Sequence, residues 1–179
     1  MNTILSEEMT FTTAGLADRF DSEVEAAEPI LPSFGGLTRF YGAIITLDIY
    51  EDSGLIQEIL REPGEGKVLV VDGGGSVQRA LVGQELAQLG KDNGWQGMII
   101  YGCVRHAARL AEIAIGIRAL ASSPLPPSEH GRGSGHKPVH FAGITFREGQ
   151  YVYVDEDGIL IAPRDLVEFT TENTERTEG

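Results

Sequence analysis

Hydrophobic and polar positions along the chain predict a mixed succession of helices and strands. Apolar residues that alternate with polar ones predict strands, and apolar residues three or four positions apart predict amphipathic helices. Clusters of Gly and Pro mark the turns between them. The predicted helices span 12–19, 52–61 and 83–93. The predicted strands span 39–50, 67–71, 97–101, 113–120, 139–146, 151–154 and 159–162.

The segment 67–109 is typical of a βαβ unit, with two apolar runs that each end in a glycine-bearing turn and a helix between them. Ligands of such units bind at the carboxyl ends of the strands, where helix N-termini also point. The second run leads through Gly102, predicted to be flexible, to Arg105. A guanidinium suits a carboxylate there because it offers a planar fork of donors.

Composition narrows the class of protein. The 179 residues fit one domain, expected over 1–167, followed by an acidic tail, 168–179, that is predicted to be disordered. The formal net charge of −13 argues against direct nucleic-acid binding, which needs clustered Lys and Arg. The single Cys103 fits a reducing cytoplasm, and neither a signal peptide nor an 18-residue apolar run is present.

A glycine run, 72–76, follows a predicted strand and raises the question of a phosphate loop. It matches neither nucleotide template, because Gln78 stands where a dinucleotide fingerprint has its third glycine and no Gly-Lys-Ser/Thr follows. Two interpretations stay open: a tight turn that uses the positive φ available to glycine, and a cradle for a small anion.

A second candidate is the start of the helix at 83–93. The free N–H groups of a first helical turn attract anions, and with Arg105 they would hold a small carboxylate. An ordinary helix start is the equal alternative. The candidate anion-binding residues are Gly83, Gln84, Glu85, Leu86 and Arg105.

Cysteine and histidine suggest two further chemistries, each with a simpler alternative. A thiol–imidazole pair of Cys103 and His106 would suit nucleophilic catalysis, although a lone Cys at a strand end is commonly a small buried hydrophobe. His130, His136 and His140 would suggest zinc, but their spacing matches no compact zinc motif, and a mobile loop explains the run between them.

Taken together, a series of short motifs resembles the RraA family, the regulators of ribonuclease E activity and the related 4-hydroxy-4-methyl-2-oxoglutarate aldolases. The resemblance covers roughly 11–163, in order and at family-like spacing. The matching stretches are Phe34-Gly-Gly, Val70-Val-Asp-Gly-Gly-Gly-Ser, Arg79-Ala-Leu-Val-Gly, Gly94-Trp-Gln-Gly, Tyr101-Gly-Cys-Val-Arg, Ile115-Gly-Ile-Arg-Ala-Leu, Gly143-Ile-Thr-Phe and Tyr153-Val-Asp-Glu-Asp-Gly-Ile, each written with the number of its first residue.

The resemblance implies an α/β, swivelling-type β/β/α fold with mixed sheets in a single domain. It also implies a homotrimer with sites near subunit boundaries, and the apolar glycine-rich segment 34–37 is expected to pack against a neighbour. Catalytic members hold a divalent metal, usually Mg²⁺, and bind a pyruvate-like 2-oxo acid. The carboxylate contacts amides that match 83–86 and the arginine that matches Arg105, and an Asp directly after this arginine carries the metal.

The sequence departs from that pattern at the metal position, where His106 replaces the Asp. Three further acidic positions of the family hold Gln84, Arg109 and Ser134. Mg²⁺ prefers oxygen ligands, so imidazole is a poor substitute for a carboxylate, whereas Zn²⁺ or Mn²⁺ could accept His106.

We therefore expect a cytoplasmic, homotrimeric RraA-like regulator. Its partner would be an RNase E-type endoribonuclease or an associated RNA-degradation protein, inhibited by protein contact. The alternative is a metal-dependent carbon–carbon lyase, an aldolase or oxaloacetate decarboxylase acting on 2-oxo acids, with Arg105 as the catalytic residue and His106 as an altered metal ligand. A small-anion sensor without catalysis is a third possibility.

Overall fold

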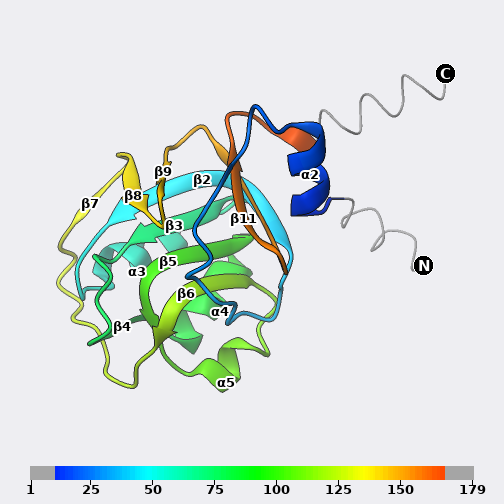
Figure 1. Ribbon diagram of the computed structural model, residues 1–179. Helices are drawn as coiled ribbons and strands as arrows, with labels where there is room; N and C mark the ends of the chain where they lie inside the picture. Colours follow the sequence, from blue (N-terminus) through cyan, green and yellow to red (C-terminus); the bar gives the residue numbers. More distant parts are fainter. Residues whose placement is uncertain (1–10, 168–179) are drawn as a thin grey trace.

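The computed structural model describes residues 11–167, which form one mixed β-sheet with helices and a small hairpin packed on it (Figure 1). Along the sheet the strands are β1 (Glu25–Ala26), β11 (Gly158–Ala162), β10 (Tyr151–Asp155), β2 (Phe40–Asp48), β3 (Val68–Asp72), β5 (Gly97–Val104) and β4 (Ala80–Val82). Off this path, β6 (Gly116–Ser122) pairs with β5 and β7 (Ser134–Gly135) with β2. The hairpin is β8 (Val139–Phe141) and β9 (Ile144–Phe146). The helices are α2 (Thr13–Arg19), α3 (Gly54–Leu60), α4 (Gln84–Asp92) and α5 (Ala107–Leu110).

The predicted class, an α/β swivelling-type fold with mixed sheets, is confirmed. Strands β2, β3, β5 and β6 are parallel, whereas β10, β11 and β1 join them through antiparallel pairs. Strand β5 is paired on both edges, with an interruption at Gly102. One edge pairs with β3 and then β4, and the other pairs with β6.

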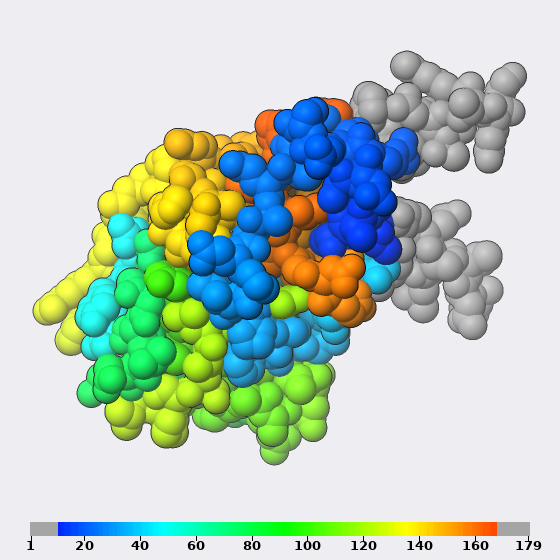
Figure 2. All heavy atoms as spheres, in the orientation of Figure 1, coloured from blue at the N-terminus to red at the C-terminus, as the bar shows by residue number. Residues whose placement is uncertain are grey.

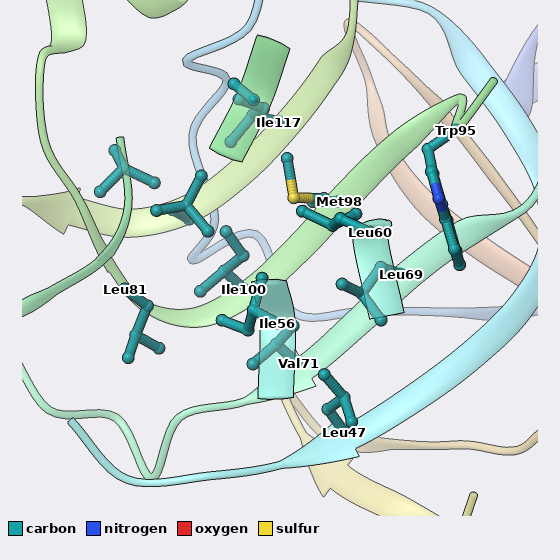
Figure 3. Close-up of a cluster of buried hydrophobic side chains, with 14 of the residues drawn as sticks. Leu47, Ile56, Leu60, Leu69, Val71, Leu81, Trp95, Met98, Ile100 and Ile117 are labelled. Carbon is teal, nitrogen blue, oxygen red and sulfur yellow. The ribbon is translucent and has the colours of Figure 1, made fainter. Parts of the chain in front are cut away.

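The central strands are apolar on both faces because both faces of the sheet are covered. Leu69 and Val71 of β3 point into a core that includes α3 and α4, shown in Figure 3. Val68 and Val70 point to the opposite face and join a second core with the β8–β9 hairpin. This double burial explains why the sequence shows a continuous apolar run rather than alternation at 68–71.

A segment without regular structure covers the outer edge of β6. The amide of Phe34 donates to the carbonyl of Ile117 at 2.8 Å, and that of Gly36 donates to Ile113 at 2.8 Å. A Cβ at Gly35 would lie 2.1 Å from the carbonyl oxygen of Ile115, so glycine permits this close approach. Figure 2 shows the chain from α2 to this segment, in blue, lying on the surface. The segment 34–37 thus pairs along β6 within its own chain, and its expected contact with a neighbouring subunit stays a prediction.

Several predicted boundaries also shift. The strand predicted at 139–146 is a hairpin, because Ala142 and Gly143 adopt φ values of 51° and 76°. Gly102 is not a flexible hinge but a buried residue inside β5, which runs on to Val104. Strand β4 and helix α5 were not predicted, and the tail 168–179 lies outside the described residues.

Asp155 attaches helix α2 to the sheet. Its buried carboxylate accepts hydrogen bonds from the amide and the hydroxyl of Thr13, at 2.7 and 2.6 Å, and from the amide of Asp157 at 3.0 Å. Burial would raise the pKa of Asp155, but these donors outweigh burial and hold the pKa below its usual value of 3.8.

Replacing Asp155→Asn should therefore destabilise the protein by about 1–3 kcal/mol at pH 7, because one donor of Thr13 then faces an amide NH₂ group. The charged form is favoured in the folded state, so its contribution is present above pH 3.8 and is lost as the pH falls through the folded pKa. Urea unfolding at pH 7 and pH 3 measures the free energy of unfolding of the variant and of the native protein. The difference between the two should be smaller at pH 3 than at pH 7. An equal difference at both pH values would contradict this, and the exposed Asp157→Asn is the control.

Candidate functional site

The candidate site lies at the carboxyl end of β5, where the sheet changes its pairing. Strand β3 ends opposite Tyr101, and β4 then takes the same edge of β5, opposite Cys103 and Val104. The amide of Arg105 donates to the carbonyl of Val82 at 2.9 Å. Because Gly83 follows Val82 directly, Arg105 and the start of α4 are brought side by side, as the sequence predicted.

Gly83 is the N-cap of α4, and its φ of −124° and ψ of −165° are extended values open to any residue. Glycine is required here because a side chain would not fit. A Cβ would lie 2.8 Å from Nδ1 of His106 and 3.0 Å from Cγ of Arg105. Of the other three predicted residues, Glu85 is exposed in the first turn and Leu86 packs partly buried against the core. The amide of Gln84 donates to Nδ1 of His106 at 3.2 Å.

His106 has a left-handed backbone, with φ of 57° and ψ of 43°, and is the N-cap of the short helix α5. An amide N–H can only donate, so Nδ1 of His106 accepts and carries no proton. The neutral imidazole then holds its proton on Nε2. The side chain that stands at the family's metal position is thereby engaged with the backbone of α4.

Arg105 is half-buried. Its Nε is shielded from solvent and has no hydrogen-bond partner among residues 11–167. A buried donor without a partner is energetically unfavourable, and it is the kind of group that an added anion satisfies. This geometry is compatible with the predicted carboxylate contact.

The side chains around His106 do not fit Mg²⁺. Gln84 offers an amide, and Arg109 is an exposed cation 3.7 Å from Glu112. Ser134 lies in β7, which pairs with β2 rather than with β5. Across 11–167, no three His, Cys, Asp or Glu residues are placed together as a metal site requires. Mg²⁺ needs several oxygen ligands, and this set supplies cations and amides instead.

Cys103 and His106 do not form a nucleophilic pair. The thiol is fully buried in β5, and burial raises its pKa, so the reactive thiolate is disfavoured. Nδ1 of His106 is already engaged with Gln84. The structure supports the interpretation of Cys103 as a small buried hydrophobe.

The three other histidines have separate partners. Nδ1 of His136 lies 2.8 Å from a carboxylate oxygen of Glu148, and Nδ1 of His140 lies 2.9 Å from the hydroxyl of Thr145. His130 uses its amide, which donates to Asp52 at 2.9 Å. The histidine run therefore gives no zinc site within the described part of the chain.

Asp52, the first residue of the helix predicted over 52–61, organises that loop. Its buried carboxylate accepts from the amides of Gly54, His130 and Gly131 at 2.8, 2.9 and 3.0 Å. Burial would raise the pKa of Asp52, but the amides outweigh it and lower the pKa. His130 and Gly131 lie far from Asp52 in sequence, so no local motif could reveal these two contacts.

The glycine run after β3 is a tight turn. Gly74 and Gly75 have φ values of 67° and 72°. The amides of Gly73 and Gly75 donate to the carbonyl of Tyr101, and that of Gly74 donates to the carboxylate of Asp72. All three glycine amides have partners, so none is left to form an anion cradle.

The geometry defines a class of protein: a mixed α/β fold in which an arginine lies beside the start of a helix. The sequence model of the RraA-like family (Aldolase/RraA) matches residues 13–161. The chain belongs to this family. Among residues 11–167, no helix is long and apolar enough to span a membrane.

Two relatives at 46–47% identity carry the same name. A protein of Alkalilimnicola ehrlichii is 47% identical over 160 residues, 89% of this chain and 99% of its own, and one of Dechloromonas aromatica is 46% identical over 162 residues, 88% and 99%. Both are provisionally named 4-hydroxy-4-methyl-2-oxoglutarate aldolase.

Two solved structures have similar folds. The RNA-processing inhibitor RraA of Thermus thermophilus has a TM-score of 0.84 and 39% identity, covering 87% of this chain and 94% of its own. A Geobacillus kaustophilus structure described as an S-adenosylmethionine:2-dimethylmenaquinone methyltransferase has a TM-score of 0.86 and 39% identity, covering 88% and 98%. The shared fold therefore does not select one activity.

Burial of Cys103 gives a direct test of the site's packing. A thiol reagent such as dithionitrobenzoate should react with the native protein at least about a hundredfold more slowly than with the protein in denaturant, because the thiol is shielded and protonated. Absorbance of the released thiolate follows the reaction. Complete labelling of the native protein within minutes would show that Cys103 is accessible and that the thiol–imidazole pair has to be reconsidered.

Proposed function

We propose that the chain is an RraA-type regulator that binds an RNase E-like endoribonuclease, or a protein associated with it, and inhibits RNA cleavage by protein contact. Membership of the RraA-like family supports the proposal, as does the 39% identity to a protein described as an RNA-processing inhibitor. The predicted homotrimer belongs to the same proposal and stays a prediction.

The single observation that carries the proposal is the chemistry of the side chains around the end of β5. Gln84, Arg105, His106 and Arg109 supply an amide, two cations and an imidazole engaged with the backbone. Metal-dependent cleavage beside a keto group needs a bound cation that stabilises the enolate oxygen. These four side chains do not favour such a cation, so a role by contact is favoured over a role in catalysis.

Charge suggests which surface meets the partner. A groove of ≈ 640 Å³ between α4 and α5 is lined by three acidic residues, Glu85, Asp92 and Glu112, and by one cation, Arg109. Leu89 and Ile113 give the groove an apolar part. A basic segment with an apolar side chain complements this surface, and the net charge of −13 would speed its approach.

The test is cleavage of a short RNA by a purified RNase E-like endoribonuclease with increasing amounts of this protein. We expect inhibition at 0.1 M salt that weakens toward 1 M salt, because the Debye length falls from about 10 Å to about 3 Å. Glu85→Lys combined with Asp92→Lys should weaken inhibition by about tenfold, roughly 1.4 kcal/mol.

The matched control is Asp18→Lys combined with Asp21→Lys, which makes the same change in net charge on exposed residues in and just after α2. It should inhibit nearly as well as the native protein. Absence of inhibition and of binding at 0.1 M salt would contradict the proposed function, and equal losses in the two variants would place the contact outside the groove.

A metal-dependent lyase is the second candidate, favoured by the names of the relatives at 46–47% identity and by Arg105, whose Nε has no partner among residues 11–167. Oxaloacetate with Mg²⁺ or Mn²⁺ should then release pyruvate faster in the presence of the protein than with metal alone. The regulator proposal expects equal rates. Turnover on the order of 10 per second would favour the lyase instead.

Either candidate leaves a small-anion site at Arg105. Arg105→Ala should weaken binding of oxalate, measured by calorimetry in EDTA, by about 2–4 kcal/mol, because a charge-assisted and often bidentate contact is lost. Arg105→Lys should restore only part of the lost binding free energy, since lysine keeps the charge but not the planar fork of donors. Arg109→Ala is the control. A lower melting temperature with unchanged oxalate binding would show that Arg105 is structural.

A further inference from the structure

The imidazole of His106 occupies the start of helix α4. The helix has no side-chain cap of its own, because its N-cap is Gly83. The acceptor comes instead from the chain that follows β5, where Nδ1 of His106 lies 3.2 Å from the amide nitrogen of Gln84. We propose that His106 is the capping residue of α4 and that this use excludes it as a metal ligand, so that the site works without a divalent metal.

The backbone around His106 is built to aim the ring at α4. Its carbonyl accepts from the amides of Arg109 and Leu110 at 2.9 and 3.0 Å, which fixes the first turn of α5. The residue itself is left-handed, a conformation in which Asn, Asp and His are found more readily than other side chains with a Cβ.

Gly83 provides the space for the ring. A Cβ there would come within 2.8 Å of Nδ1 and 3.3 Å of Cε1 of His106, closer than side-chain packing allows without a shift. The extended backbone of Gly83 accepts any residue, so conformation does not explain the glycine. The pair Gly83 and His106 therefore forms one interlocking unit.

Capping leaves His106 poorly suited to a metal. Nδ1 accepts the Gln84 amide, and the neutral ring then holds its proton on Nε2. For Nε2 to bind a cation the proton would have to move to Nδ1, which would break the hydrogen bond to Gln84. No group of three ligands within residues 11–167 would compensate for this. The inference shares with the proposed function the observation that the side chains at the end of β5 do not favour a cation. Its test is separate, because the cap is measured on this protein alone, whereas inhibition is measured on a ribonuclease.

Nitrogen-15 NMR of the imidazole tests the cap directly. Native protein near neutral pH should show Nδ1 of His106 unprotonated and Nε2 protonated, with a coupling or shift that links Nδ1 to the Gln84 amide. Titration with Mn²⁺ or Zn²⁺ should leave these signals in place. One metal per chain that broadens the His106 signals, and that His106→Ala abolishes, would overturn the proposal.

Variants give a second readout. His106→Ala should lower the melting temperature by about 2–6 °C, the usual effect of losing a cap in a chain of this size. His106→Asn should stay within about 2 °C of native, because its side-chain oxygen can accept the Gln84 amide and Asn tolerates the left-handed backbone. Replacement of an exposed histidine, His130→Ala, is the control and should leave the melting temperature unchanged.

A double-mutant cycle completes the test. Gly83→Ala should lower the melting temperature of the native protein, yet have less than half that effect when His106 is already Ala, because the ring it displaces is gone. Additive effects, or equal melting temperatures for the Ala and Asn variants of His106, would show that the ring does not cap α4.

Discussion

The pairing of β5 along both edges is the constraint on which the rest of the site depends. Strand β3 pairs with β5 only as far as Tyr101, so the last residues of β5 are left for β4 on the same edge. Because β4 passes directly into α4, the bond between the Arg105 amide and the Val82 carbonyl fixes the helix start against the end of β5. The meeting of Gly83, Arg105 and His106 follows from the register of three strands.

The parts of the fold that local patterns determine were predicted. Buried parallel strands have continuous apolar runs, and α4 has a clear apolar face, so both are visible in the sequence. Strand β4 has only three residues and no period that could be recognised. The pairing of the segment 34–37 with β6 depends on partners far away in sequence, and so do the bonds of Asp52 with His130 and of Asp155 with Thr13. No local pattern encodes these contacts.

The position of Arg105 beside the start of α4 was predicted, but the bonding between the residues there was not. Proximity of Arg105 to 83–86 followed from the βαβ pattern. The use of the imidazole of His106 as a cap did not, because it depends on a left-handed backbone and on the empty space over Gly83. The chain retains the family's fold and its arginine. The residue after the arginine, His106, instead caps helix α4. Relatives named for an aldolase, a methyltransferase and an RNA-processing inhibitor resemble this chain, so the fold alone does not select one activity.

The central claim is that the end of β5 is a metal-free site closed by His106. Crystals of the protein soaked in manganese, with diffraction recorded to locate anomalous scattering, test it most directly. The account predicts no anomalous peak within coordination distance of His106, and Nδ1 still within hydrogen-bond distance of the Gln84 amide. A manganese peak bound by His106, with the ring turned away from Gln84, would contradict it.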